Sequence, residues 1–209
     1  MPYIASIALL LTCISFGGLA LERTDIAAAA ADVTPLLVGQ SAPDTSLLTV
    51  DGAPVSLQAL TMEQPTVLIF YRGGWCPYCN RQLAGLKDLE QPLSDLGYQI
   101  LAISPETPAQ LQAQKLQAKF AVQLLSDASL ETIRGFGIAY YVAQDITDKY
   151  KAKANIDLNH QDGSGRAVLP APAVFIIDQQ GRVKFSYVNP DYKVRLSPEL
   201  LYQAAKYSL

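Results

Sequence analysis

The chain has 209 residues, 50% of them hydrophobic, and a formal net charge of −3 at pH 7. This is enough apolar sequence for one domain with a packed core, and the lack of basic blocks argues against nucleic-acid binding. Three cysteines are too few for a disulfide-stapled small fold or a four-cysteine zinc site.

The N-terminal segment, residues 1–31, has the features of a signal peptide or membrane anchor. No charged side chain precedes Glu22, and residues 4–21 are apolar apart from small and hydroxyl residues. Alanines at 27–31 suit signal-peptidase cleavage, while the apolar stretch is also long enough to span a bilayer. We therefore expect a protein that is exported, either periplasmic or membrane-anchored and facing outside the cytoplasm, with membrane contact only through this segment. Cys13 lies within the apolar stretch.

A hairpin and a buried strand are the first elements expected after this segment. Residues 47–50 and 55–57 flank Asp51-Gly52, a dipeptide typical of a tight hairpin turn. Residues 66–71 are apolar with branched and aromatic side chains, which predicts a strand buried on both faces. We expect the hairpin to be an N-terminal extension of the sheet that contains this strand.

A helix is predicted from Cys76 to about Leu96, because leucines recur there at helical spacing and Gly97 ends the pattern. Pro92 is expected to kink or restart it. Further strands and helices alternate along the chain, at residues 99–104, 107 onward, 122–125, 129–134, 142–153, 174–178 with 182–188, and 197–207. This alternation predicts an α/β sandwich with a central mixed sheet flanked by helices, irregular mainly over 140–169.

A Cys-Pro-Tyr-Cys motif at 76–79 follows the predicted buried strand through a turn with two glycines. The turn places Cys76 at the positive end of a helix, which lowers a thiol pKa, and Cys79 lies within disulfide reach on the same side. We interpret the pair as a dithiol redox centre. The alternatives are a structural disulfide, two metal ligands or buried thiols. So small a loop stabilises little, and a metal would need more ligands than one histidine supplies.

Other side chains near the motif have two interpretations each. Arg72 is expected either to place positive charge beside the thiolate or to pair with a carboxylate. Trp75 and Tyr78 are expected either to shield the thiolate and bind substrate or to pack as core. His160 is expected to be a solvated loop residue. Asp191, Tyr192 and Arg195, near the C-terminal helix, are expected to be structural, in a salt-bridged turn.

Four segments together carry a family resemblance: VGQSAPD at 38–44, FYRGGWCPYC at 70–79, PAVFIID at 172–178 and NPDY at 189–192. With them the chain resembles the thioredoxin-fold AhpC/TSA (redoxin) family, in its peroxiredoxin-like subgroup. The resemblance runs from about residue 38 to the C-terminus, and the cysteine segment is its most specific part. It implies a thioredoxin-like domain over residues 38–209.

The resemblance also implies a function. Cys76 would attack a hydroperoxide or a disulfide, and Cys79 would resolve the product to a Cys76–Cys79 disulfide. An external thiol reductant, thioredoxin-like or a small thiol, would restore the dithiol, and no metal, flavin or nucleotide cofactor is implied. Pro172 would precede a central strand through a cis peptide bond opposite the dithiol, so that Ala171 offers backbone groups to substrate; the alternative is an ordinary proline that starts a strand.

Two features of the family are missing. Typical members carry proline four residues and threonine or serine three residues before the reactive cysteine, where this chain has Arg72 and Gly73. The arginine that precedes the late central strand is replaced by Pro172. The alternatives are therefore a thiol-disulfide exchange protein without peroxidase activity and a redox-inert thioredoxin-like binding domain, which the intact Cys-Pro-Tyr-Cys motif disfavours.

Overall fold

A computed structural model describes residues 25–117, 122–160 and 162–208. The apolar stretch of the predicted targeting segment, together with Cys13, lies outside the described residues. Within these ranges, no helix is both long enough and apolar enough to cross a membrane. The chain from Ile26 to Leu36 lies against the domain, where Ala27 pairs with Tyr140 and both end residues contact the core.

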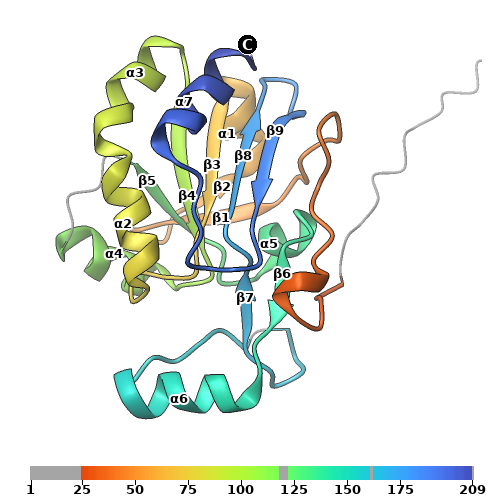
Figure 1. Ribbon diagram of the computed structural model, residues 1–209, viewed down its shortest axis with the longest axis vertical. Coiled ribbons are helices and arrows are strands. Elements are labelled where there is room, and N and C mark those ends of the chain that lie inside the picture. Colours follow the sequence, from red (N-terminus) through yellow and green to blue (C-terminus); the bar gives the residue numbers. More distant parts are fainter. Residues whose placement is uncertain (1–24, 118–121, 161, 209) are drawn as a thin grey trace, which may run out of the picture.

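Seven strands of the described chain form one mixed sheet at the centre of the molecule (Figure 1). They are β1 Ser46–Thr49, β2 Pro54–Ser56, β3 Thr66–Phe70, β4 Gln99–Ser104, β5 Gln123–Ser126, β8 Ala173–Ile177 and β9 Val183–Val188. Their order is β2-β1-β5-β4-β3-β8-β9, with β3 parallel to β4 and antiparallel to β8. The predicted mixed sheet is confirmed. The predicted hairpin is β1 with β2, and it extends one edge of the sheet because β1 also pairs with β5.

Helices cover both faces of this sheet, so β3 and β8 are buried along their whole length. Alternate residues of β3 therefore enter different cores. Leu68 and Phe70 join one hydrophobic cluster, while Val67 and Ile69 join the other, which also contains the two cysteines of the motif. The apolar run that predicts the strand thus fills two cores at once.

The helices divide between the two faces. They are α1 Leu57–Glu63, α2 Pro77–Gly85, α3 Glu90–Asp95, α4 Pro108–Gln117, α5 Glu131–Gly135 and α7 Pro198–Lys206. Side chains of α1 and α5 pack in the cluster on one face, and side chains of α2, α3, α4 and α7 pack in the other. We call the sheet with these helices the body. The long helix predicted from residue 76 is interrupted by a 3-10 turn, Lys87–Leu89, and Pro92 lies in the first turn of the restarted helix α3.

One segment, residues 139–170, leaves the body and returns; we call it the excursion. It consists of β6 Ala139–Tyr141, α6 Gln144–Ala154 and β7 Val168–Pro170, with β6 antiparallel to β7. Helix α6 lies apart from the sheet at one end of the molecule (Figure 1). The helix agrees with the prediction, whereas β6, β7 and α1 were not predicted.

Candidate active site

The motif follows β3 through a tight turn whose shape requires glycine. Gly73 has φ of 148°, and a Cβ atom there would lie 2.3 Å from Trp75 Nε1. The Cys76 N–H donates to the carbonyl of Gly73 over 3.1 Å. A threonine or serine at position 73, where the family has its hydroxyl, does not fit this arrangement without displacing the indole.

Both cysteines lie where the sequence predicts. Cys76 is the N-cap of α2 with extended backbone (φ −88°, ψ 113°), Pro77 is the first helical residue, and Cys79 is inside the first turn. The two side chains are reduced and almost completely buried, with 1% of Cys76 and none of Cys79 exposed. The helix therefore holds one thiol at its positive end and a second against the core.

The environment gives the two thiols opposite properties. A hydrogen bond from the Cys79 thiol lowers the pKa of Cys76 to about 6, against the opposing effect of burial, and the nearby charges of Arg72 and Arg195 lower it further. Burial, followed by the adjacent Cys76 sulfur, raises the pKa of Cys79. At neutral pH, Cys76 is therefore a thiolate, and Cys79 is the thiol that donates to it.

Arg72 is buried, with 3% of its surface exposed, and it lies among aromatic rings. Its Nη2 donates to the Tyr150 hydroxyl over 2.8 Å, and its guanidinium lies 4.2 Å from the ring centroid of Tyr192 and 5.1 Å from that of Trp75. Within the described chain, no carboxylate forms an ion pair with it, and its Nε has no hydrogen-bond partner. The structure therefore favours the first interpretation of Arg72, a charge beside the thiolate.

Arg195 is a site residue that sequence reasoning missed. Its Nη2 donates to Cys79 Sγ over 3.3 Å, and its Nη1 donates to Gln82 Oε1 over 3.1 Å. The expected salt bridge in the 191–195 turn is therefore replaced by contacts with a thiol and an amide. No local signal identifies this role, because the two contacting residues are 116 positions apart.

Four aromatic side chains form a partly buried rim around the dithiol. The Trp75 ring lies 5.0 Å from Tyr150, and the Tyr78 ring lies 5.7 Å from Tyr192. Trp75 and Tyr78 also pack against the cluster that contains the cysteines. Both rings therefore pack as core, as one interpretation expects, while shielding of the thiolate and substrate binding by them stay predictions.

A network of polar side chains holds the backbone of Gly74 in the turn before the motif. Sequence reasoning missed this network as well. The Gly74 N–H donates to Glu106 Oε2 over 2.8 Å, and Asn80 Nδ2 donates to the Gly74 carbonyl over 2.7 Å. Gln114 Nε2 donates to Asn80 Oδ1, and Gln114 Oε1 accepts from the Tyr71 hydroxyl. Burial raises the pKa of Glu106, against hydrogen bonds that lower it. Both polar groups of Gly74 are therefore held in place.

The expected geometry at Pro172 is not found. The peptide bonds of the described residues are all trans, so the predicted cis bond before Pro172 is wrong. The N–H of the buried Ala171 donates to the Ile138 carbonyl over 2.8 Å, and the Pro172 carbonyl accepts from Asn189 N. The Ala171 N–H is thus already paired with Ile138, where the excursion returns to the body. Pro172 directly precedes β8 as a strand-initiating proline, and substrate binding by it stays a prediction.

The other candidate residues lie away from this chemistry. His160 is exposed, with Nδ1 3.1 Å from the Gly165 carbonyl, as expected for a solvated loop residue. Among the described residues, no group of three or more His, Cys, Asp or Glu side chains is placed to hold a metal ion.

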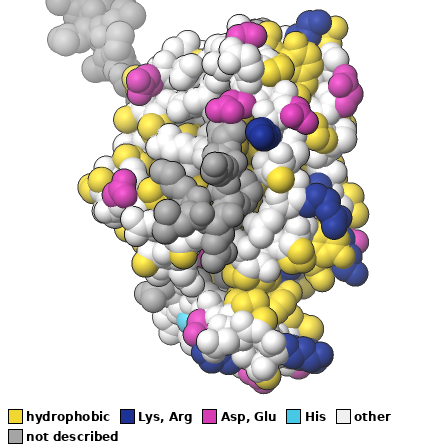
Figure 2. Space-filling model, turned by 90° about the vertical axis from the view of Figure 1, so that its left-hand side faces the viewer, with side chains coloured by type: hydrophobic (Ala, Val, Ile, Leu, Met, Phe, Trp, Pro, Cys, Tyr) yellow, Lys and Arg dark blue, Asp and Glu magenta, His cyan; other side chains and the backbone are white. Residues whose placement is uncertain are grey.

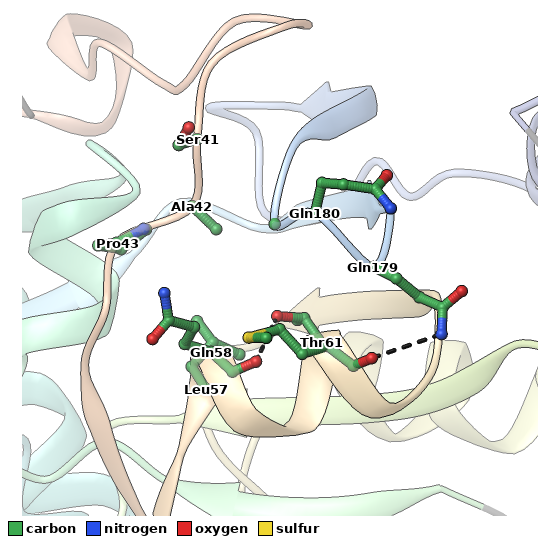
Figure 3. A pocket seen from close by; sticks show the side chains of 10 residues that line it. Ser41, Ala42, Pro43, Leu57, Gln58, Thr61, Gln179 and Gln180 are labelled. Carbon is green, nitrogen blue, oxygen red and sulfur yellow. Dashed lines mark hydrogen bonds between the residues drawn. The ribbon is translucent and has the colours of Figure 1, made fainter. Parts of the chain in front are cut away.

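A pocket of about 340 Å³ lies elsewhere on the body, between residues 41–43, α1 and the β8–β9 turn (Figure 3). Its polar side chains are amides and hydroxyls, and Gln179 is bonded to the carbonyl of Met62. No titratable group or thiol lines it. The pocket therefore offers no group for the redox chemistry described above.

Comparisons with known proteins identify a family and similar chains. A model of the AhpC/TSA family matches residues 38–186. Peroxiredoxin Bcp of Escherichia coli is 31% identical over 106 residues, which are 51% of this chain and 67% of that protein. The chloroplastic peroxiredoxin Q of Arabidopsis thaliana is 26% identical over 151 residues, 72% of this chain and 59% of that protein.

Solved structures show the same fold. Reduced Prx3 of Vibrio vulnificus in complex with H2O2 superimposes with a TM-score of 0.66, at 18% identity, over 81% of this chain and 99% of that chain.

Proposed function

The chain belongs to the AhpC/TSA family, and from this membership and the geometry of the dithiol we propose that it is a thiol-dependent peroxidase. The single observation that carries the proposal is the placement of two buried free thiols, Cys76 at the N-cap of α2 and Cys79 in its first turn, where the Cys79 thiol lowers the pKa of Cys76 to about 6. The thiolate is the nucleophilic form of cysteine, and a neighbouring thiol is needed to resolve its oxidation product.

The reaction has three steps. The Cys76 thiolate attacks the terminal oxygen of a hydroperoxide and the O–O bond breaks. The other oxygen leaves as hydroxide or alkoxide and takes a proton from solvent, which gives water or an alcohol. Cys76 is then a sulfenic acid. The Cys79 sulfur attacks it, the S–O bond breaks, and the hydroxyl leaves with the Cys79 proton as water. Two thiol equivalents of an external reductant finally reduce the Cys76–Cys79 disulfide and are themselves oxidised to a disulfide.

Arg72 compensates for the missing hydroxyl at position 73. Its guanidinium is the positive group beside Cys76 on the β3 side, and its Nε has no partner among the described residues. A buried N–H without an acceptor is costly, so a peroxide oxygen that accepts from it would be stabilised. Charge that develops on the leaving oxygen would be stabilised by the same group.

The partners and the compartment are parts of the proposal. The reductant would be a thioredoxin-like protein or a small thiol that reaches the Cys76–Cys79 disulfide. The protein would act outside the cytoplasm, because residues 4–21 have the apolar character of a signal peptide or anchor. An oxidising compartment would favour the disulfide, so a dedicated reductant would be needed there.

One alternative has a specific observation in its favour. Gly73 replaces the family hydroxyl and cannot be exchanged for it without moving Trp75. That observation favours a thiol-disulfide exchange protein without useful peroxidase activity. The discriminating measurement is the second-order rate of Cys76 with hydrogen peroxide against its rate with a disulfide peptide. We expect the peroxide rate to be the larger, and a faster disulfide reaction would favour the alternative.

The peroxidase is tested by consumption of hydroperoxide with a thiol donor. We expect Cys76→Ser to abolish turnover and Cys79→Ser to allow one oxidation of Cys76 without disulfide formation, seen by mass spectrometry. Cys13→Ser is the matched control, because Cys13 lies outside the motif, and it should keep full activity. Turnover that survives Cys76→Ser would disprove the assignment. A thiol titration that does not change on mild reduction and reoxidation would favour the redox-inert domain.

A further inference from the structure

The nucleophile is closed off from solvent in this conformation. Only 1% of Cys76 and 3% of Arg72 are exposed, although the proposed reaction requires the Cys76 sulfur to meet a molecule from outside. Some part of the enclosure must therefore move during each turnover. Tyr150 and Tyr192 close the site from outside the turn, through their contacts with Arg72.

Helix α6, which carries Tyr150, has little contact with the hydrophobic cores of the body, and only Tyr150 packs, partly buried, against a small cluster that Trp75 also contacts. None of its residues is buried, whereas every residue of β3 and β8 is buried. Its Lys149–Asp145 ion pair lies within the helix, and Lys151 pairs with Asp157 just beyond it. In Figure 2, charged side chains gather at the lower end of the molecule, with a band of hydrophobic side chains above them. A helix with so little buried surface can separate from the body at low cost.

Tyr150 connects this helix to the dithiol. Its hydroxyl accepts from Arg72 Nη2 over 2.8 Å, and its ring lies 5.0 Å from the Trp75 ring and 5.5 Å from the Arg72 guanidinium. The same guanidinium lowers the pKa of Cys76. The hydrogen bond between Arg72 and Tyr150 therefore attaches α6 to the body and also fixes the Arg72 charge beside the Cys76 thiolate.

We propose that Tyr150 is a positioning residue that latches α6 over the dithiol, so that docking of the helix both closes the site and fixes Arg72 beside Cys76. The inference rests on the proposed role of Cys76 as nucleophile. With the latch closed, water is excluded and the Arg72 charge acts at close range. With the latch open, substrate or reductant reaches the sulfur, and Arg72 becomes hydrated.

Other groups also act on Cys76 and stay in place when α6 moves. Cys79 donates to it from α2, and Arg195 acts on it from the 191–195 turn. The Tyr140 hydroxyl faces Arg72 and Cys76 from β6. Opening the latch should therefore weaken the activation of Cys76 without abolishing it.

The test uses the full chain in a Cys13→Ser background, reduced, with Tyr150→Ala and Tyr150→Phe. Two quantities are measured: the Cys76 pKa by thiolate absorbance, and the rates of alkylation by iodoacetamide and by a bulky maleimide. We expect Tyr150→Ala to raise the pKa by about 1 unit. It should raise the maleimide rate relative to the iodoacetamide rate about tenfold, because one hydrogen bond and one ring contact are lost. Tyr150→Phe keeps the ring and should have a smaller effect on both.

Tyr207→Ala is the control, because Tyr207 is 79% exposed at the end of α7. It should change neither quantity. Circular dichroism checks folding, and if Tyr150→Ala does not fold, Tyr150→Phe decides alone. The latch is overturned if the folded variants match the control in both quantities. A wild-type protein that shows the expected titration and labelling but does not consume peroxide contradicts the proposed function and leaves the latch standing.

Discussion

The body and the excursion differ in how completely their elements are buried. Strands β3 and β8 are buried at every residue and belong to two hydrophobic clusters. Helix α6 has no buried residue, and only its Tyr150 packs against a small third cluster of Val142, Leu158, Ala167 and Leu169. The dithiol lies near the place where the two regions meet, since Cys76 and Cys79 pack in the body while Tyr150 of the excursion bonds to Arg72 in the turn that precedes them. The body thus fixes the reacting atoms, and the excursion controls access to them and the charge around them.

The largest expected effect separates the two regions by stability. Phe175 is completely buried, and its ring packs against Phe70 and Phe136, so Phe175→Ala should lower the free energy of unfolding by about 3–5 kcal/mol. Ile146 on α6 is 36% exposed, and Ile146→Ala should change it by less than about 0.5 kcal/mol. Chemical denaturation measures both. Equal losses from the two variants would contradict the contrast between the regions.

A smaller loss of stability is expected from removing the Glu106 carboxylate that accepts from the Gly74 N–H. Glu106→Ala leaves the Gly74 N–H without its acceptor and should cost about 1–3 kcal/mol of stability. Glu106→Gln supplies a neutral acceptor at the same place and should cost less.

The same pair of variants makes a prediction about pH. Burial raises the folded pKa of Glu106 above its unfolded value, so the carboxyl is most favourable when protonated. Its contribution to stability is therefore present at acid pH and is lost as pH rises through the folded pKa. Denaturation as a function of pH should show a weaker dependence in Glu106→Gln than in wild type, and an unchanged dependence would exclude this carboxyl as its source.

The next prediction compares the effects of Arg72 and Arg195 on the pKa of Cys76. Arg72→Met removes a charge that acts on Cys76 and should raise the pKa of Cys76 by about 1 unit. Arg195→Met should have a smaller effect on Cys76, because Arg195 contacts Cys79 and not Cys76. Thiolate absorbance during pH titration measures both shifts. A larger shift from Arg195→Met would show that Arg195, and not Arg72 among the aromatic rings, is the main positive charge that lowers the pKa of Cys76.

The elements of the body could be predicted because their signals are local. The apolar run of β3 and the Asp51-Gly52 turn each lie within a few residues. Strands β6 and β7 were missed because each has three residues and they pair across the whole excursion. Helix α1 was missed because Leu57, expected in a strand, is its first residue.

The site divides in the same way. Cys76 and Cys79 are recognisable from a four-residue motif next to a strand, since helix geometry alone places them on one side. Tyr150 and Glu106 lie 78 and 32 residues from their partners in the turn, so tertiary packing brings them to the site. Sequence reasoning thus identifies the nucleophile and not the groups that tune it.

The activation of Cys76 is tested most directly by a titration of the reduced protein in the Cys13→Ser background, with thiolate absorbance followed against pH. We expect a single thiolate that forms with a midpoint near pH 6, because the Cys79 thiol and the two arginine charges stabilise it. Cys79 should remain protonated throughout the neutral range. A first midpoint at the ordinary thiol value of about 8.5 would contradict the central claim that this fold activates Cys76.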